Sequence, residues 1–262
     1  MNIKGIYIIF LSTFMFSISV RGYVGQSDVC RKHSNYSNDE IVALILARGG
    51  SKGIHLKNLA QIGSDTLLSR TLKTIFNSKV FADVWVSTDS DLIASEAIKF
   101  NANVHIRAKH SADDSTTSIA SVQEFLNIHS EINNVALVQC TSAFLTVRYL
   151  QEAVQLFQTT QVDCVFAVTR SFKLRWNYDA GKLVPLNFNL LHRPRRQDWN
   201  GELVETGMIY VTKKSLLQNG AFQNERCGFI EVCPSDELEI DSPSDLQLAN
   251  VLIKLRKNYA AV

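Results

Sequence analysis

One stretch, Ile41 to Asn58, constrains the fold of this chain more than any other. Its first part, Ile41 to Ala47, is uncharged and rich in Ile, Leu, Val and Ala, as expected for a parallel strand buried on both faces. The strand leads into a loop with three glycines, Gly49, Gly50 and Gly53, and a helix is expected after it. This order is typical of anion sites, because backbone N–H groups of the turn point at the ligand.

The glycine loop also carries three cations, Arg48, Lys52 and Lys57. Glycines that allow close approach, combined with long basic side chains, predict a site for polyphosphate. Neither the Walker A pattern nor GxGxxG is present, so the spacing alone indicates an anion site and no particular nucleotide. The alternative is a solvated basic loop that follows a core strand.

Four ordered motifs together resemble a known family. The first, Leu46 to Asn58, resembles the L-A-R-x-x-S-K-G-x-x-x-K-N signature of the cytidylyltransferases that activate acidic sugars, and among these most closely the sialic acid enzymes. The others are Gln139-Cys140-Thr141-Ser142, Arg193-Pro194-Arg195-Arg196-Gln197-Asp198-Trp199 and Glu239-Ile240-Asp241. The resemblance covers residues 40–257 and implies that CTP and an N-acylneuraminate (sialic acid) react to give CMP-sialic acid and pyrophosphate.

Two alternatives to this function stay open. One is a cytidylyltransferase for another acidic sugar, such as Kdo. The other is a non-catalytic luminal sugar-nucleotide binder, which Glu239 favours because the family usually has Asp there. Lys57, Gln139 and Asp241 are all present, which argues against a non-catalytic binder, since binding alone does not require groups for both metal and triphosphate.

The resemblance implies which side chains hold CTP. The residues at nucleotide-binding positions are Arg48, Ser51, Lys52, Lys57, Asn58, Arg107, Thr116 and Ser118. Lys57 and Arg48 are expected to be catalytic, because cations placed near the phosphates offset the charge that develops as pyrophosphate leaves. No motif residue is an obvious general base.

The resemblance also implies a sugar site and a metal site. Gln139 is expected to hydrogen-bond the sugar, and Arg195 to bind its carboxylate through a planar, bidentate guanidinium. Mg²⁺ is the expected cofactor, held by Asp241 and Glu239. Alternate residues of a strand face the same way, so both carboxylates can reach one ion, although Glu239 has a longer arm than the family's aspartate.

Strands and helices alternate along most of the chain, which predicts an α/β, Rossmann-like, mostly parallel sheet with helices on both faces. Ligands of such sheets bind outside the carboxyl ends of the strands, where Arg48, Asp89, Arg107 and Gln139 are expected to gather. The expected strands are Ile41–Ala47, Asp83–Thr88, Asn103–Ile106, Val135–Gln139, Asp163–Thr169, Leu203–Val211 and Phe229–Cys233.

The alternation stops at about residues 170–202. Trp176, Tyr178, a Gly181 turn and Pro185 predict a β-hairpin between Lys173 and Phe188. The resemblance implies that this small excursion mediates a homodimer, although a private cluster of its aromatic side chains is an alternative.

The N-terminus predicts a secretory route. After Lys4, Gly5 to Val20 is uncharged and shorter than an ordinary membrane-spanning helix, so residues 1–22 are interpreted as a signal peptide or an uncleaved signal anchor. Membrane association is expected only in the second case. Residues 23–39 are polar and are expected to form a disordered linker, with an N-glycosylation sequon at Asn35. The Golgi lumen is the expected location.

Charge and cysteine content set two further limits. A net charge of +2 and a pI near 8.2 are too mild for a nucleic-acid binder, so no nucleic-acid partner is expected. The 5 cysteines cannot all pair with one another, and Cys140 and Cys164 are expected to be free in core strands. Cys227 with Cys233 is the candidate for a local bridge.

Overall fold

The computed structural model describes residues 36–108 and 116–259. The expected signal segment, Asn35 and Cys30 lie outside these ranges. The last residues of the expected linker join the fold, because the Tyr36 hydroxyl donates a hydrogen bond of 2.9 Å to Asp83 and Asn134 donates one of 2.7 Å to the Asn38 carbonyl. Within the described ranges, no helix combines the length and apolar character that a bilayer crossing requires.

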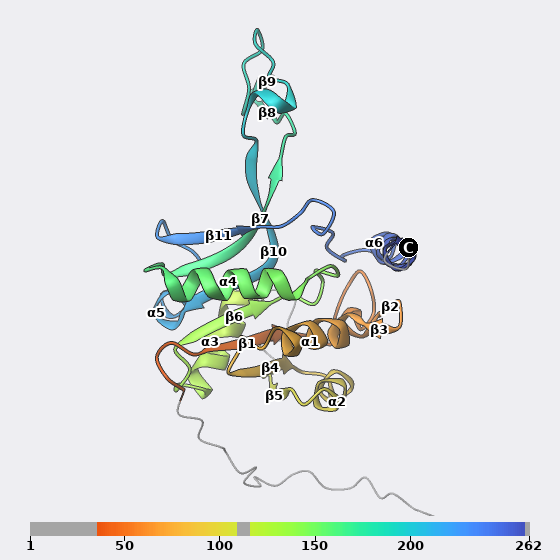
Figure 1. Ribbon diagram of the computed structural model, residues 1–262, viewed down its shortest axis with the longest axis vertical. Helices are drawn as coiled ribbons and strands as arrows, with labels where there is room; N and C mark the ends of the chain where they lie inside the picture. The colour runs from red at the N-terminus through yellow and green to blue at the C-terminus, as the bar shows by residue number, and fades with distance from the viewer. Residues whose placement is uncertain (1–35, 109–115, 260–262) are drawn as a thin grey trace, which may run out of the picture. The chain divides into compact units, whose positions relative to one another are not determined.

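A seven-stranded sheet with the order β11-β7-β10-β6-β1-β4-β5 forms the centre of the fold (Figure 1). Its strands are β1 (Ile41–Leu46), β4 (Asp83–Thr88), β5 (Asn103–Ile106), β6 (Asn134–Val138), β7 (Cys164–Ser171), β10 (Glu202–Lys213) and β11 (Cys227–Glu231). Strand β10 runs antiparallel to β6 and β7, and every other pairing in the sheet is parallel. The expected mostly parallel sheet is confirmed.

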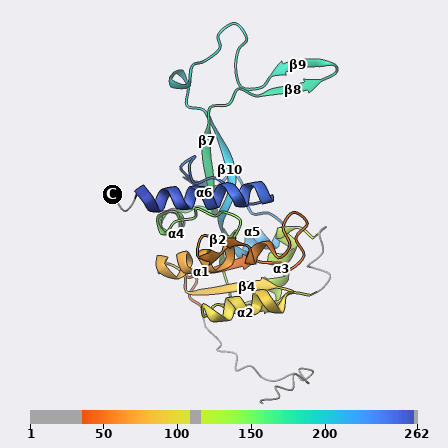
Figure 2. The ribbon, with the colours of Figure 1, turned by 90° about the vertical axis from the view of Figure 1, so that its right-hand side faces the viewer.

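Strand β1 shows why helices cover both faces of this sheet. Ile41, Ala43 and Ile45 pack into one core, whereas Val42 and Leu44 pack into a second core on the opposite face. The first core receives α1 (Leu67–Ser78), α2 (Asp91–Lys99), α4 (Val147–Thr159) and α6 (Pro243–Tyr259), and the second receives α3 (Ser118–Ile128) and α5 (Lys214–Gln218) (Figure 2). The uncharged run of β1 is therefore buried on both sides, as its sequence predicts.

Short elements complete the fold. A 3₁₀ turn, η1 (Lys57–Leu59), follows the glycine loop, and β2 (Gln61–Ile62) pairs with β3 (Asp65–Thr66) just before α1. Helix α1 begins where the Thr66 side chain accepts a 2.9 Å hydrogen bond from the Ser69 amide, which satisfies one of the open donors of the first turn.

Residues 172–201 form an arm that leaves the sheet between β7 and β10 (Figure 1). It contains the hairpin of β8 (Trp176–Asp179) and β9 (Lys182–Pro185), as the sequence predicts, and a 3₁₀ turn, η3 (Arg196–Asp198). The two turn residues of the hairpin, Ala180 and Gly181, have φ values of 47° and 78°. Positive φ at both positions matches the twist of a two-residue hairpin.

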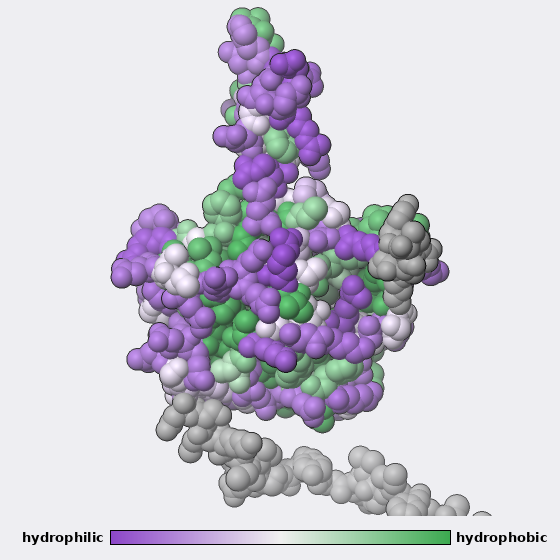
Figure 3. Space-filling view, viewed as in Figure 1, coloured by the Kyte–Doolittle hydropathy of each residue, from purple (hydrophilic) through white to green (hydrophobic). Residues whose placement is uncertain are grey.

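The arm packs some of its aromatic side chains against one another and exposes other large apolar groups. Trp176 contacts Phe188 edge-on, with ring centroids 5.1 Å apart. In contrast, Tyr178 is 72% and Leu191 is 88% exposed. Figure 3 shows hydrophobic patches on the arm between hydrophilic side chains. The arm therefore has a small cluster of its own and still presents apolar surface.

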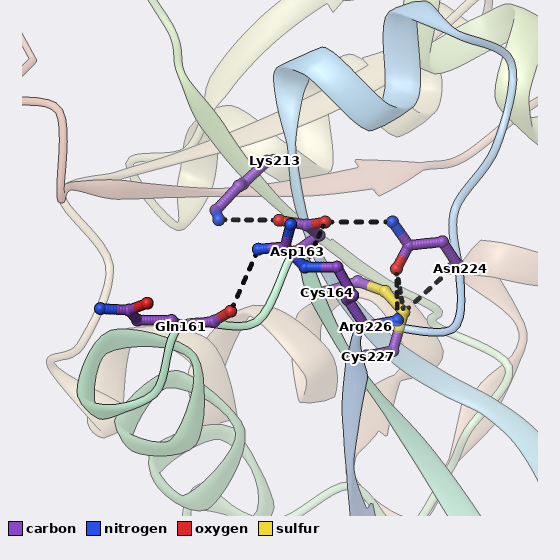
Figure 4. A network of polar contacts seen from close by, with 7 residues as sticks. All are labelled: Gln161, Asp163, Cys164, Lys213, Asn224, Arg226 and Cys227. Carbon is purple, nitrogen blue, oxygen red and sulfur yellow. Dashed lines mark hydrogen bonds and ion pairs between the residues drawn. A yellow bond between two sulfur atoms is a disulfide. The ribbon is translucent and has the colours of Figure 1, made fainter.

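One disulfide joins Cys164 of β7 to Cys227 of β11 (Figure 4). The candidate bridge between Cys227 and Cys233 is not formed, and the expectation of a free Cys164 is wrong, because parallel pairing places Cys164 and Cys227 in direct register. Cys140 is free and buried as expected, and Cys233 is free and exposed. The bridge closes a loop with a sequence separation of 63, a constraint on the unfolded chain worth about 4 kcal/mol in the chain-entropy model.

Polar contacts surround this disulfide (Figure 4). Asp163 accepts hydrogen bonds from Lys213 (2.9 Å) and Asn224 (3.1 Å), and Arg226 lies 3.4 Å from the same carboxylate. The bond from Lys213 is the main reason that the pKa of Asp163 is held below its usual value. These contacts and the disulfide fasten the start of edge strand β11 to its neighbours.

Candidate functional site

The loop after β1 lies at the edge of the sheet where the parallel strands end. Strands β1, β4, β5 and β6 run in the same direction, so their carboxyl ends share this edge. The Gly49 amide donates a 2.7 Å hydrogen bond to Asp89, which follows β4. The Arg107 amide, after β5, donates one of 2.9 Å to the Thr88 carbonyl. The expected gathering of these residues at one edge is confirmed.

A cavity of about 320 Å³ opens at this edge of the sheet. Its walls come from the glycine loop, the ends of β1 and β6, the start of α3 and the segment before α6. The predicted site residues that line it are Arg48, Ser51, Lys52, Lys57, Asn58, Ser118, Gln139 and Asp241. The structure thus brings most of the predicted residues to one place, while their individual roles stay predictions.

Asn58 holds the two ends of the glycine loop together. Its side chain is buried, and its Nδ2 donates a 3.2 Å hydrogen bond to the Arg48 carbonyl. Leu56, just before η1, has a φ of 47°, a left-handed turn that reverses the chain ahead of Lys57. The hydrogen bond of Asn58 and the turn at Leu56 together fix the end of the loop, from which Lys57 lines the cavity.

Lys57 and Asp241 form the central ion pair of the cavity, with Nζ 2.9 Å from Oδ1. Lys57 is mostly covered, whereas the Asp241 side chain is 71% exposed. A second contact lies beside it, because a Cβ at Gly53 would be only 2.4 Å from the Asp241 carbonyl oxygen. Two segments that are 184 residues apart in sequence are therefore held against each other at the cavity.

The acidic pair has the alternating arrangement that the sequence predicts. Ile240 is completely buried, and Glu239 and Asp241 on either side of it are not. Asp241 lines the cavity, and Glu239 lies next to it, where its Oε1 accepts a 2.8 Å hydrogen bond from the Thr141 hydroxyl. Asp245, at the start of α6, accepts bonds from Ser242, and these lower its pKa and fix the chain after Asp241.

These carboxylates fit a magnesium ion. Among residues 36–108 and 116–259, no three His, Cys, Asp or Glu side chains form a metal-binding cluster. Mg²⁺ is ordinarily held by one or two protein carboxylates, with phosphate oxygens and waters as its other ligands. Asp241 and Glu239 supply the hard oxygen donors that this mode of binding needs.

Two predicted nucleotide contacts do not line the cavity. Arg107 is buried, and its guanidinium donates 3.3 Å hydrogen bonds to the hydroxyl and the carbonyl of Ser87. Burial is the main cause of its lowered pKa, which the nearby Asp89 opposes. Thr116 precedes α3 and is also absent from the lining. The Arg107 guanidinium therefore binds the end of β4 and not the wall of the cavity.

Arg195 lies away from the cavity, on the arm. Its side chain is 74% exposed and forms a two-pronged ion pair with Asp198, with the shortest distance 2.7 Å. The expectation that Arg195 and Gln139 share one sugar pocket is not met within a single chain, because Arg195 belongs to the arm and does not line the cavity that contains Gln139.

Three residues at the site had no role assigned from the sequence. Thr141 lines the cavity and contacts both Glu239 and Gln139. Gly207, with a φ of 71°, sits in a bulge of β10, where a Cβ would be 3.3 Å from Gln139 Nε2. Cys140 also lines the cavity, and burial raises the pKa of its thiol to about 12, which excludes a thiolate nucleophile at neutral pH. The Gln139–Ser142 motif was the available signal for Thr141.

Comparison with protein families gives a match to the family model described as cytidylyltransferase, over residues 42–261. N-acylneuraminate cytidylyltransferase A of Danio rerio is 39% identical over 223 residues, which are 84% of this chain and 52% of the relative. N-acylneuraminate cytidylyltransferase of Escherichia coli is 29% identical over 84% of this chain and 53% of the relative. This chain therefore spans about half the length of these curated relatives.

Solved structures show the same fold at low sequence identity. The CMP:2-keto-3-deoxy-manno-octonic acid synthetase complexed with CTP superposes with a TM-score of 0.64 and 17% identity, covering 83% of this chain and 99% of that one. 4-Diphosphocytidyl-2C-methyl-D-erythritol synthase of Anaerococcus prevotii superposes with a TM-score of 0.61. At such identities the likeness concerns the fold alone.

The contact between Gly53 and Asp241 leads to a prediction about stability. Gly53→Ala places a methyl group against a backbone oxygen that cannot rotate away, so we expect the free energy of unfolding to fall by roughly 1–3 kcal/mol. Gly50→Ala is the matched control, because no atom lies within 4 Å of its added Cβ. Urea unfolding of the two variants measures the difference. Equal stabilities would contradict the observed packing.

Proposed function

Because this chain belongs to the cytidylyltransferase family, we propose that it couples CTP to an N-acylneuraminate and releases pyrophosphate. The relatives named above supply the proposed sugar, since they are named for N-acylneuraminate. One structural observation carries the proposal: a single cavity at the carboxyl ends of parallel strands is lined by Arg48, Lys52 and Lys57 together with Asp241. That combination of cations and a carboxylate suits a nucleoside triphosphate with its metal ion.

The reaction assigns clear tasks to the cavity. The oxygen of a sugar hydroxyl bonds to the α-phosphorus of CTP, the bond from this phosphorus to the bridging oxygen breaks and releases pyrophosphate, and the hydroxyl proton passes to water. Cations beside the phosphates stabilise the charge that accumulates on the departing pyrophosphate. Lys57 is suited to this task because its side chain lines the cavity and its ammonium group lies 2.9 Å from Asp241, beside the proposed position of the metal ion.

Magnesium is the proposed cofactor. When bound, it neutralises phosphate charge and orients the triphosphate for attack. Asp241 would hold it at the cavity and Glu239 would support it from the adjoining position, because hard oxygen ligands are what this ion prefers.

The direct test is to incubate the purified chain with CTP, Mg²⁺ and N-acetylneuraminic acid and to measure pyrophosphate, with Kdo in a parallel reaction. Release with the sialic acid alone is the expected result, and release with Kdo alone would support the alternative sugar.

Lys57→Ala should lower kcat by at least about a hundredfold, the usual cost of removing one electrostatic group from such a site. Lys254→Ala, an exposed position of α6, is the control. Binding of CTP without pyrophosphate release would support the non-catalytic binder.

We propose further that two copies of this chain form a homodimer through the arm. The exposed Tyr178, Leu183 and Leu191 supply apolar surface for a partner. A second copy also explains Arg195, because an arm that reaches the partner's cavity would bring its guanidinium toward the sugar site there. The arm would then serve both assembly and catalysis.

Mixing two inactive variants tests this arrangement. Lys57→Ala damages the cavity, and Arg195→Ala damages the arm. In an equal mixture, half of the dimers contain one copy of each variant, and one of the two sites in such a dimer is intact. The mixture should therefore recover about a quarter of the wild-type rate. Sedimentation equilibrium should give twice the chain mass. A monomer, or a mixture with no recovered activity, would contradict the shared site.

The proposed location is the Golgi lumen, reached by the secretory route. The uncharged N-terminal stretch, the sequon at Asn35 and the Cys164–Cys227 disulfide all support it, since disulfides persist in oxidising compartments. In secretory cells, the wild-type chain should lose mass on N-glycosidase treatment and Asn35→Gln should not. A chain that stays unglycosylated in the cytosol would contradict the proposal.

A further inference from the structure

Thr141 occupies a position between the proposed sugar contact and the proposed metal ligand. Its side chain is 9% exposed, and its hydroxyl oxygen lies 2.8 Å from Glu239 Oε1 and 3.3 Å from Gln139 Oε1. Among the described residues, no other side chain forms hydrogen bonds to both of these groups. Thr141 therefore connects the proposed sugar contact, Gln139, with the proposed metal ligand, Glu239.

The backbone holds Thr141 in this position. The Ile240 amide donates a 2.9 Å hydrogen bond to the Thr141 carbonyl, and Ser142 forms an antiparallel bridge with Glu239. The segment after β6 and the segment before α6 are thus paired side by side. This pairing sets the hydroxyl of Thr141 opposite the carboxylate of Glu239.

The Thr141 hydroxyl has a single proton and can donate it to Glu239 or to Gln139, but not to both at once. A hydroxyl donates only one hydrogen bond at a time, and a bond to an ionised carboxylate is shorter and stronger than one to a neutral amide. The distances agree, since the Glu239 contact is the shorter one by 0.5 Å, from 3.3 and 2.8 Å. Thr141 therefore fixes Glu239, and the Gln139 oxygen stays available to accept a hydrogen bond from a ligand hydroxyl.

Glu239 needs such a restraint more than Asp241 does. Its side chain has one more rotatable bond than an aspartate, and its other oxygen, Oε2, faces Gly207, where the missing side chain leaves space. Without a fixed partner, the carboxylate would divide its time among several rotamers, and ordering it would cost binding energy. One bond from Thr141 selects the rotamer that lies beside Gly207 and Gln139.

We propose that Thr141 is a positioning residue, whose hydroxyl orients the Glu239 carboxylate for a divalent cation while leaving the Gln139 amide available to the sugar. The inference rests on the proposed function of the same cavity. It assigns to the hydroxyl a role in metal affinity that packing of the threonine side chain alone would not have.

The test compares Thr141→Val, which keeps the shape and removes the hydroxyl, with Thr141→Ser, which keeps the hydroxyl. The dissociation constant of Mn²⁺ is measured by electron paramagnetic resonance in the presence of CTP and without sugar, so no turnover is needed. We expect a rise of about 10-fold or more in Thr141→Val, and a value within about threefold of wild type in Thr141→Ser, as for other residues that orient a metal ligand.

Two further variants separate positioning from simple stability. Thr212→Val removes another buried hydroxyl, which donates a 3.1 Å hydrogen bond to the Phe222 carbonyl, and it should lower stability without changing Mn²⁺ affinity. In a Glu239→Gln background, Thr141→Val should have little additional effect on Mn²⁺ affinity, because the two residues act through one bond.

Each outcome bears on the proposal. Equal Mn²⁺ affinity in wild type and Thr141→Val, or failure of Thr141→Ser to restore it, would overturn the assignment, as would a wild-type chain that binds no Mn²⁺ with CTP. A shift in Mn²⁺ affinity in a chain that releases no pyrophosphate would support the role of Thr141 and at the same time refute the proposed reaction. The two failures are thus distinguishable.

Discussion

The site depends on one junction, where the glycine loop after β1 lies against the segment that contains Asp241. Strand β1 is buried on both faces, so the point at which this loop begins is fixed by two cores. The Gly53 backbone touches the Asp241 carbonyl, and Lys57 reaches the Asp241 carboxylate. Because of this contact, the cations of the glycine loop and the carboxylate of Asp241 line the same cavity.

The position of the acidic segment in turn depends on the edge of the sheet. Strand β11 is fastened at its start by the Cys164–Cys227 disulfide and at its end by a two-pronged ion pair from Arg170 to Glu231, at 2.7 and 2.9 Å. The chain that leaves β11 reaches Glu239 within a few residues. An edge strand is the least supported part of a sheet. Fastening it at both ends limits how far the acidic segment can move from the cavity.

The sequence predicts the fold well wherever a local pattern decides the structure. Strands β4 and β5 have the predicted bounds, because short apolar runs flanked by polar residues are sufficient to define them. The glycine loop, Asp89 and Gln139 gather as expected, because parallel strands end at a common edge. Long-range pairing decides the rest. The partner of Cys164 follows from the register of β7 with β11, which no local spacing reveals, and the direction of the arm decides where Arg195 lies.

The charges of the cavity are suited to exchange rather than to permanent pairing. Asp241 is 71% exposed, and an ion pair with so much solvent access contributes at most about 1 kcal/mol. Lys57 can therefore exchange Asp241 for another anion at little cost, and the Asp241 carboxylate can take another cation in its place. Glu239 differs, because its bond from Thr141 is partly buried and leaves its second oxygen toward Gly207. One carboxylate can thus change partners while the other keeps its orientation, as the proposed binding of phosphate, metal and sugar in one small cavity would require.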